Sequence, residues 1–385
     1  MAFNNELIDE DITSTNGGDW NRRITSDDRK RFYFFKNKRF QTRVFIENTA
    51  TACLFENCHF ENGVVFSKPN VSADILADKI FNCRIGLVDC KIEKQLVITD
   101  CTFEKKVRFH DCDIETFLPG NAIFKNLADF WSTSFRTSVT FYKTDFNATT
   151  VFSMVTFENN VLFTYSLLAD KTIFSRTKFK KGVDFSQAII SGDLRFFDLN
   201  IRMFKSPYFH KDDKGYQKAI DHEGVIPLVN KQETFRLLKH YANSNGDGMS
   251  ASRFKVFEYR SYNLLIWKQM WHRHRWISNL ANIPMMLLNR VTNNYGSNYW
   301  LGVIFTICVA ILFLNSMLGE SLGYFYTWEY ENWQWDKFTT LINPVHRITD
   351  LNVELTKRIY VLDFLSRITV GYGIYQTVQA FRKFK

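Results

Sequence analysis

Cysteine follows an acidic or amide residue repeatedly in the first third of the chain, a pattern that could do metal chemistry. Five of the seven cysteines stand in the pattern [ND]-C-x-[FI]: Cys58, Cys83, Cys90, Cys101 and Cys112. Thiolate zinc sites need pairs of cysteines a few residues apart that converge on one point. Here Cys101 and Cys112 lie a whole repeat apart, so we expect inward-facing repeat positions and no metal site.

The stretch Thr369-Val370-Gly371-Tyr372-Gly373 is the second candidate for chemistry. It resembles the selectivity filter of the potassium-channel family, in which backbone carbonyls replace the hydration shell of the ion. In that family a full inner helix follows the filter, whereas here the sequence ends at Lys385, soon after Gly373. A helix over this remainder covers about 18 Å of the roughly 30 Å of hydrocarbon. We therefore expect Gly371 and Gly373 to lie inside a helix and to let a neighbouring helix approach. A potassium filter formed by these five residues is an alternative.

Charged and amide side chains accompany this motif. Asp363 and Arg367 stand at positions i and i+4, on one face of a helix, and such a pair partly offsets the cost of carrying charge into hydrocarbon. The candidates for a pore or for helix packing are Asp363, Arg367, Thr369, Gly371, Tyr372, Gly373, Gln376 and Gln379. We find no phosphate loop, no spaced metal ligands and no nucleophile with its base, so neither an enzyme nor a cofactor is expected.

Two apolar segments would position these residues. The stretch 299–318 contains no charged residue and is long enough to cross a bilayer as a helix, and a buried core helix is the alternative. Seven Lys and Arg against one acidic residue precede this stretch in 253–298, and six acidic against two basic residues follow it in 319–356. With no secretory signal at the N-terminus, the positive-inside rule predicts a multi-pass membrane protein with both termini in the cytosol. A second span is expected at about 359–381.

Tryptophan alternates with basic residues just before the first span. We expect a membrane-interface anchor made of Trp267, Lys268, Trp271, Arg273, Arg275 and Trp276. A nucleic-acid patch or a histidine metal pair are the alternatives.

Large apolar residues recur with alternating gaps of six and five in the first half of the chain, which helps to explain its 38 Phe. A smaller residue stands two positions before each one, as Thr133 does before Phe135, and in an extended segment both point inward. Each step is then one short strand and one turn, and successive steps must stack into a solenoid to bury the large residue. From residue 124 the large residues are Phe124, Phe130, Phe135, Phe141, Phe146, Phe152, Phe157, Phe163, Leu168, Phe174, Phe179, Phe185, Ile190, Phe196 and Ile201.

This repeat resembles the pentapeptide-repeat family over roughly residues 44–205. The resemblance implies a right-handed β-helix of square cross-section with four steps per coil. Because every second step is stretched by one position, we expect about 22 residues per coil in place of about 20. The region holds 19 Lys and Arg and 19 Asp and Glu, which argues against the DNA mimicry of some family members and against a nucleic-acid partner.

The sequence therefore predicts a β-solenoid, an α-helical connector and two transmembrane helices. The expected parts are a polar and basic segment (1–43), the solenoid (44–205), the connector with the basic-aromatic stretch (206–290) and the membrane domain (291–385). The connector resembles that of pentapeptide-repeat proteins with a C-terminal membrane segment. We expect a non-enzymatic protein whose cytosolic solenoid controls or scaffolds a homo-oligomeric pore or channel in the lipid bilayer, with copies assembling through the membrane helices or the solenoid. The alternative is a membrane-anchored adaptor that binds a cytosolic protein partner and conducts nothing.

Overall fold

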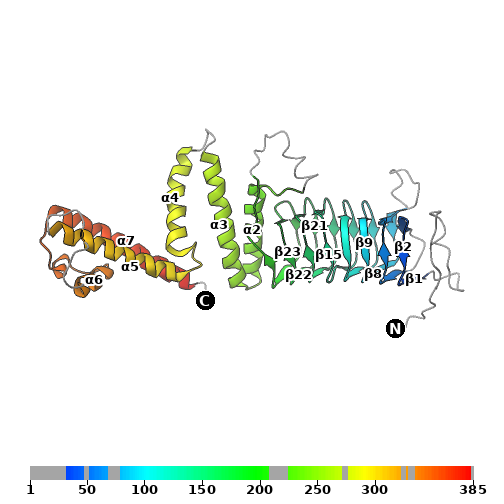
Figure 1. Ribbon diagram of the computed structural model, residues 1–385, viewed down its shortest axis with the longest axis horizontal. Helices are drawn as coiled ribbons and strands as arrows, with labels where there is room; N and C mark the ends of the chain where they lie inside the picture. Colours follow the sequence, from blue (N-terminus) through cyan, green and yellow to red (C-terminus); the bar gives the residue numbers. More distant parts are fainter. Residues whose placement is uncertain are drawn as a thin grey trace. The chain divides into compact units, whose positions relative to one another are not determined.

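The computed structural model describes residues 32–46, 52–67, 79–207, 224–270, 276–321, 327 and 334–382 of the 385-residue chain. They form two compact units that divide between Asn245 and Gly246. The first unit holds the strands and helix α2, and the second holds helices α3 to α7 (Figure 1).

The first unit is a β-solenoid in which short strands stack in parallel as four sheets (Figure 1). One sheet runs through eight strands in the order β1-β4-β8-β11-β14-β18-β22-β26. The strands are β1 (Phe32–Lys36), β2 (Arg39–Phe40), β3 (Val44–Ile46), β4 (Ala52–Glu56), β5 (His59–Phe60), β6 (Val64–Phe66), β7 (Ile80–Phe81), β8 (Arg84–Val88), β9 (Lys91–Val97), β10 (Thr102–Phe103), β11 (Val107–His110), β12 (Asp113–Leu118), β13 (Ile123–Phe124), β14 (Ala128–Asp129), β15 (Ser134–Phe135), β16 (Val139–Thr140), β17 (Asp145–Phe146), β18 (Thr150–Ser153), β19 (Thr156–Phe157), β20 (Val161–Leu162), β21 (Leu167–Leu168), β22 (Thr172–Ser175), β23 (Lys178–Phe179), β24 (Val183–Asp184), β25 (Ile189–Ile190), β26 (Leu194–Phe197) and β27 (Asn200–Ile201).

The register between strands gives the length of one coil. Thr150 pairs with Thr172, and Thr172 pairs with Leu194, so the pairing repeats at the coil length that the stretched steps predict. The predicted coil length is confirmed for this part of the solenoid. Val107 pairs with Ala128, one position short of that spacing, because the series of large apolar residues is one position shorter there.

The solenoid starts earlier than the sequence indicated. Strands β1 and β2 lie before Val44, and they pair with β4 and β5 of the next coil. Phe35 aligns with Phe55 and Phe40 with Phe60, so this first coil is two positions shorter than the coils around Thr172. The alternating gaps of six and five residues in the later coils therefore do not extend to this first coil.

Columns of phenylalanine rings fill the interior. Phe130, Phe152 and Phe174 stack with 4.9 Å between successive ring centroids, and Phe141 meets Phe152 edge-on at 5.9 Å. Aromatic pairs in these geometries add to the free energy gained by burying apolar area. The large residues from Phe124 to Phe185 are all buried, as predicted. In the last coil Ala188, Ile190 and Phe196 are only half-buried. Among the described residues β25 and β26 are the last strands of their sheets, so no further strand stacks on this coil there.

Every second turn of the solenoid contains a residue with left-handed backbone geometry, that is, with positive φ. In the middle of the solenoid these residues recur once for every two steps, and they include Lys, Met, Tyr and Arg. Among residues other than glycine, Asn and Asp adopt positive φ at the least cost, which accounts for Asp89, Asp100 and Asp111 just ahead of three of the cysteines. The middle positions are Asn121, Ser132, Lys143, Met154, Tyr165 and Arg176.

The cysteines after these turns donate hydrogen bonds to the preceding coil. Sγ of Cys101 lies 3.3 Å from the carbonyl oxygen of Phe66, and Thr133 makes the equivalent bond, with Oγ1 2.7 Å from the oxygen of Phe109. Burial raises the pKa of Cys101 to about 12, which keeps its thiol protonated and unreactive. Among the described residues, no group of three or more His, Cys, Asp or Glu is placed to hold a metal ion.

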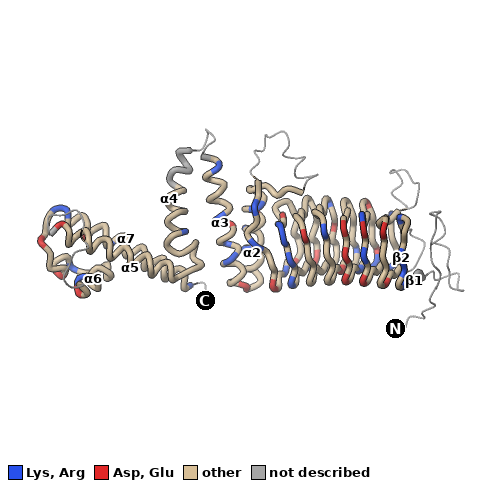
Figure 2. Tube along the Cα trace, viewed as in Figure 1, with Lys and Arg blue, Asp and Glu red and all other residues tan. Residues whose placement is uncertain are grey.

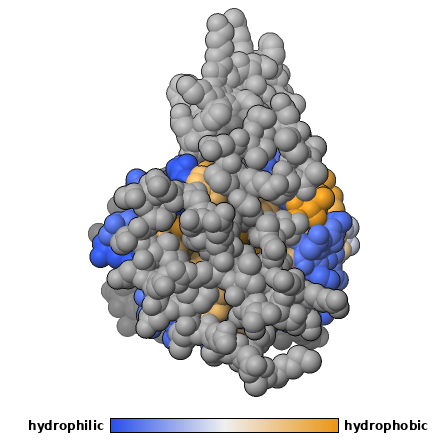
Figure 3. All heavy atoms as spheres, turned by 90° about the vertical axis from the view of Figure 1, so that its right-hand side faces the viewer, coloured by the Kyte–Doolittle hydropathy of each residue, from blue (hydrophilic) through white to orange (hydrophobic). Residues whose placement is uncertain are grey.

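The outer surface of the solenoid carries ion pairs between neighbouring coils. Lys125 Nζ lies 2.7 Å from Glu104 Oε1, and Lys180 Nζ lies 2.7 Å from Glu158 Oε1. Basic and acidic residues alternate along the coils in Figure 2. In Figure 3 hydrophilic residues lie at both edges of the view, and a hydrophobic area adjoins them at the right edge. Exposed pairs of this kind each contribute about 0–1 kcal/mol, so they give solubility more than stability.

Helix α2 (Leu228–Ser244) packs on the last coils and belongs to the first unit, although the sequence indicated a connector over residues 206–290. Asn230 Nδ2 donates to Asp184 Oδ2 at 2.8 Å, and the backbone N–H of Phe185 donates to Thr234 Oγ1 at 2.9 Å. These bonds satisfy polar groups at the end of the strand stack.

The second unit consists of α3 (Gly248–Met270), α4 (Trp276–Asn293), α5 (Tyr299–Ser321), α6 (Trp335–Ile342), the 3₁₀ helix η3 (Ile348–Leu351) and α7 (Lys357–Phe381). Helix α4 packs against α3, α5 and α7, and α5 lies along α7 (Figure 1). Among the described residues one helix, Tyr299–Glu320, is long and apolar enough to cross a membrane. The second expected span coincides with α7, which falls below that level of hydropathy.

Candidate functional site

Helices α5 and α7 form an antiparallel pair over their whole length. At one end the ring of Tyr299 stacks on that of Phe381 with centroids 4.4 Å apart. At the other end Arg358 Nη1 donates to Glu320 Oε2 at 2.6 Å. The helices contain 23 and 25 residues. At about 1.5 Å per residue both exceed the roughly 30 Å of a hydrocarbon core.

Two glycines, one on each helix, set the distance between α5 and α7. A Cβ atom at Gly302 would lie 2.5 Å from Thr377 Oγ1 and 3.0 Å from its backbone nitrogen. A Cβ atom at Gly373 would lie 3.1 Å from Cδ1 of Phe305 and closer still to Thr306 Oγ1. Neither position has room for a side chain, so glycine allows the two backbones to approach.

The threonines facing these glycines complete a symmetric arrangement. Thr306 Oγ1 donates to the carbonyl of Gly302 at 2.8 Å, and Thr377 Oγ1 donates to the carbonyl of Gly373 at 2.9 Å. Each helix therefore presents a glycine and, one helical turn later, a threonine to the same pair on its neighbour. These hydrogen bonds leave neither threonine hydroxyl hydrogen unpaired. We call the close contact between α5 and α7 at Gly302, Thr306, Gly373 and Thr377 the seam.

The five residues Thr369–Gly373 lie in the middle of the continuous helix α7, where their side chains point to different neighbours. Gly371 is not in the seam: a Cβ atom there would meet Pro344 at 3.9 Å, an ordinary contact. Thr369 Oγ1 donates back to the carbonyl of Leu365 at 2.8 Å. Of the two glycines in the motif, Gly373 alone has the close helix contact expected from the sequence.

The amide side chains of α7 are bonded to α4. Asn293 Nδ2 donates to Gln376 Oε1 and, at 3.3 Å, to Gln379 Oε1. Asn289 Oδ1 accepts from Tyr372 Oη at 3.1 Å and from Gln376 Nε2 at 3.4 Å. The sequence did not single out Asn289 and Asn293, although two amides at i and i+4 on an apolar helix are the signal that could have found them.

A buried ionic cluster lies near the start of α7. The ion pair expected between Asp363 and Arg367 forms, with Oδ2 and Nη2 2.8 Å apart. The other carboxylate oxygen lies 2.7 Å from Nε2 of His346, whose Nδ1 lies 2.6 Å from the carbonyl of Asn343. The two ring nitrogens of His346 therefore lie against two different partners, and the ring links Asp363 of α7 to the end of α6.

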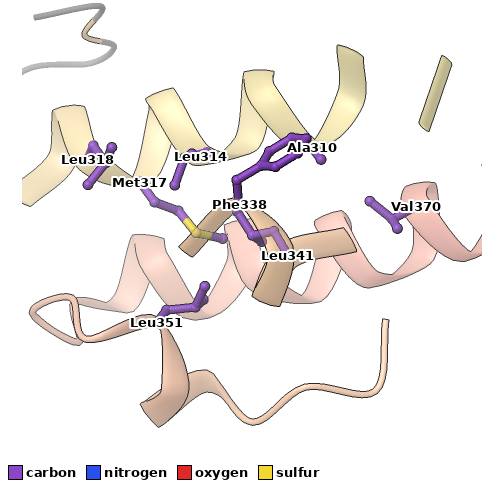
Figure 4. Close-up of a cluster of buried hydrophobic side chains, with 8 residues drawn as sticks. All are labelled: Ala310, Leu314, Met317, Leu318, Phe338, Leu341, Leu351 and Val370. Carbon is purple, nitrogen blue, oxygen red and sulfur yellow. The ribbon is translucent and has the colours of Figure 1, made fainter. Parts of the chain in front are cut away.

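Helix α6 and η3 cover the seam next to this cluster. Figure 4 shows apolar side chains from α5, α6, η3 and α7 converging, and together they exclude water from this end of the helix pair. The buried members are Ala310, Leu314, Met317, Leu318, Phe338, Leu341, Leu351 and Val370.

The outer faces of α5 and α7 expose large apolar side chains. Phe364 is 63% exposed and Tyr375 is 59% exposed, near opposite ends of α7. Soluble monomers rarely expose contiguous apolar surface of this extent. Helix α5 carries no charged residue before Glu320, and α7 carries none after Arg367 (Figure 2). The exposed side chains are Trp300, Ile304, Ile307 and Leu312 of α5, and Tyr360, Val361, Phe364, Leu365, Ile368, Ile374, Tyr375, Val378 and Phe381 of α7.

The expected interface anchor is described only in part. Trp267 is 46% exposed near the end of α3, and Lys268 lies in the last turn of that helix. Trp271, Arg273 and Arg275 lie outside the described residues, and so does the side chain of Trp276, which begins α4.

Comparison of the chain with protein-family models, with curated proteins and with solved structures found no match.

Proposed function

We propose that this chain is a non-enzymatic membrane protein of the pentapeptide-repeat type. Its solenoid, a right-handed coil of four steps per turn, lies in the cytosol, and α5 and α7 cross the bilayer as a hairpin. Several copies assemble through their hairpins into a pore that the solenoids control or scaffold.

The observation that carries the proposal is the direction in which the polar residues of α7 point. Gln376 is 4% exposed and Asp363 is 5% exposed, because they bond to α4 and to His346. Two of the residues that lower the hydropathy of α7, Gln376 and Asp363, are thus paired inside the chain, while large apolar side chains such as Phe364 are exposed on its outer face. Intramembrane polar residues in spanning helices typically face the protein interior in this way.

Assembly is required for conduction because two helices cannot enclose a pore. The outer faces of α5 and α7 provide the apolar surface on which copies would meet within a bilayer. A filter made of Thr369–Gly373 is not favoured, since the carbonyl of Gly373 already accepts a hydrogen bond from Thr377 within the helix. Carbonyls held in a helix do not turn toward an ion.

A membrane-anchored adaptor is the second candidate. It is favoured by the same internal pairing, because Asp363 and Gln376 are occupied within the chain and would have to be released to line a pore. An adaptor needs only the hairpin as an anchor and the solenoid as a surface for a cytosolic protein.

Ion flux from liposomes that contain the purified full-length chain distinguishes the two. A pore predicts release of both potassium and sodium, and Gly302→Leu should abolish it by separating α5 from α7. Protein that inserts and folds but releases neither ion would contradict the pore and favour the adaptor. Release of potassium alone would favour the filter.

A further inference from the structure

A cavity of about 400 Å³ opens in the second unit between α3 and the turn that joins α4 to α5. Its wall on α3 includes Arg253 and Arg260, which stand at i and i+7 and therefore on one face of the helix. Ser297 and Asn294 contribute polar groups from the turn. Of the described residues that line the cavity, none is acidic.

The two arginines are held in place by different contacts. Arg260 Nη2 donates to Asn294 Oδ1 at 3.2 Å, and the guanidinium of Arg253 lies 5.5 Å from the centre of the Phe257 ring. A planar guanidinium matches the oxygens of a phosphate with two parallel hydrogen bonds. Two such groups around one cavity favour an anionic, phosphate-bearing ligand.

The turn opposite the arginines has a fixed and unusual backbone. Asn294, Tyr295 and Gly296 have φ of 49°, 61° and 82°, and the N–H of Gly296 donates to Asn293 Oδ1 at 2.8 Å. Lys255 of α3 reaches this turn, since a Cβ atom at Gly296 would lie 3.5 Å from its Nζ. The site is thus built from two elements whose geometry is set before any ligand binds.

The position of the cavity identifies the source of the phosphate. Its turn ends just before α5 begins at Tyr299, and apolar Val256 and Phe257 line the same wall as the arginines. A mixture of cationic and apolar groups at the basic end of a membrane helix suits a lipid headgroup and its glycerol region. We propose that this cavity binds the headgroup of an anionic phospholipid, an inference that rests on the proposed membrane placement of α5.

Native mass spectrometry of the full-length chain in mild detergent tests this inference. The probes are phosphatidylglycerol, phosphatidylcholine and inorganic phosphate, titrated separately. We expect phosphatidylglycerol to bind, and Arg253→Ala with Arg260→Ala to weaken it about tenfold or more, since each guanidinium contributes charged hydrogen bonds. Arg253→Lys with Arg260→Lys should weaken it less, because charge is kept while the paired geometry is lost.

Lys337→Ala with Arg347→Ala is the matched control, since it removes the same charge from the same unit outside the cavity. An equal loss in this control would show attraction by general charge and overturn the site. Equal affinity for phosphatidylcholine would also overturn it, and binding of inorganic phosphate as tight as that of the lipid would replace the lipid by a free phosphate. Circular dichroism confirms that each variant is folded. Because no ion flux is measured, failure of this site and failure of the pore give different results.

Discussion

The seam between α5 and α7 allows one substitution to be compared at three glycines. Gly302→Ala, Gly373→Ala and Gly371→Ala each add one methyl group to a helix and share the same gain in intrinsic helix propensity, about 1 kcal/mol. They differ only in what the methyl group meets. Gly371 is therefore the internal control for the other two.

The contacts predict the order of the three effects. At Gly302 the new Cβ would meet backbone atoms of Thr377 at 3.0 and 3.1 Å, which can move only if α7 moves. At Gly373 it would meet the short side chain of Thr306, which is tied to the carbonyl of Gly302. Overpacking of this kind costs about 1–3 kcal/mol. Gly371→Ala should stabilise by up to about 1 kcal/mol because its methyl group has room.

The assay is unfolding of the full-length chain in mixed micelles with increasing dodecyl sulfate, followed by the helical circular dichroism signal. We expect Gly302→Ala to be least stable, then Gly373→Ala, with Gly371→Ala equal to or above the wild type. Three variants of equal stability would refute the close approach of α5 and α7. Loss of stability at Gly371 alone would place the helix contact on the other face of α7.

Three further substitutions test the two units. Phe152→Ala should cost about 3–5 kcal/mol in thermal unfolding, since Phe152 is fully buried among stacked rings, and a loss below about 1 kcal/mol would refute the packed column. Burial lowers the pKa of Lys231 from 10.5 to about 8, so the folded state binds fewer protons between these values. The free energy of unfolding of the wild type should therefore rise with pH across that range relative to that of Lys231→Met. Parallel curves of stability against pH for the two proteins would contradict the lowered pKa. Asp363→Asn should destabilise the second unit by about 3–5 kcal/mol, because it leaves His346 and Arg367 without their shared carboxylate. An unchanged free energy of unfolding would show that the cluster does not stabilise this unit.

Much of the solenoid could be predicted because the residue pattern that specifies it is repeated along the chain. The coil length and the inward direction of residues such as Phe157 follow from spacing that recurs many times. The first coil has a different spacing and occurs once, so its Phe35 and Phe40 gave no comparable signal. The left-handed turns were equally hidden, since Met154 and Tyr165 are not residues that favour positive φ.

The candidate site was predicted less completely because its contacts are distant in sequence. The pair of Asp363 and Arg367 is local to one helix and follows from spacing alone. His346 and Asn293 reach α7 from separate elements, and no periodic pattern joins them to it. The two glycines of the motif looked equivalent, and only the position of α5 shows that Gly373 lies in the seam and Gly371 does not.

The central claim is that α7 crosses the bilayer beside α5. It is tested most directly by nitroxide labels placed singly at Val361, Phe364, Ile368 and Val378, all exposed on α7, in a Cys308→Ser background that removes the one exposed cysteine among the described residues. The relative accessibility of each label to oxygen and to a water-soluble nickel complex gives its depth in liposomes. A spanning helix predicts the greatest depth at Ile368, near the middle, with shallower labels toward both ends. Uniformly shallow or water-accessible labels along α7 would contradict the hairpin.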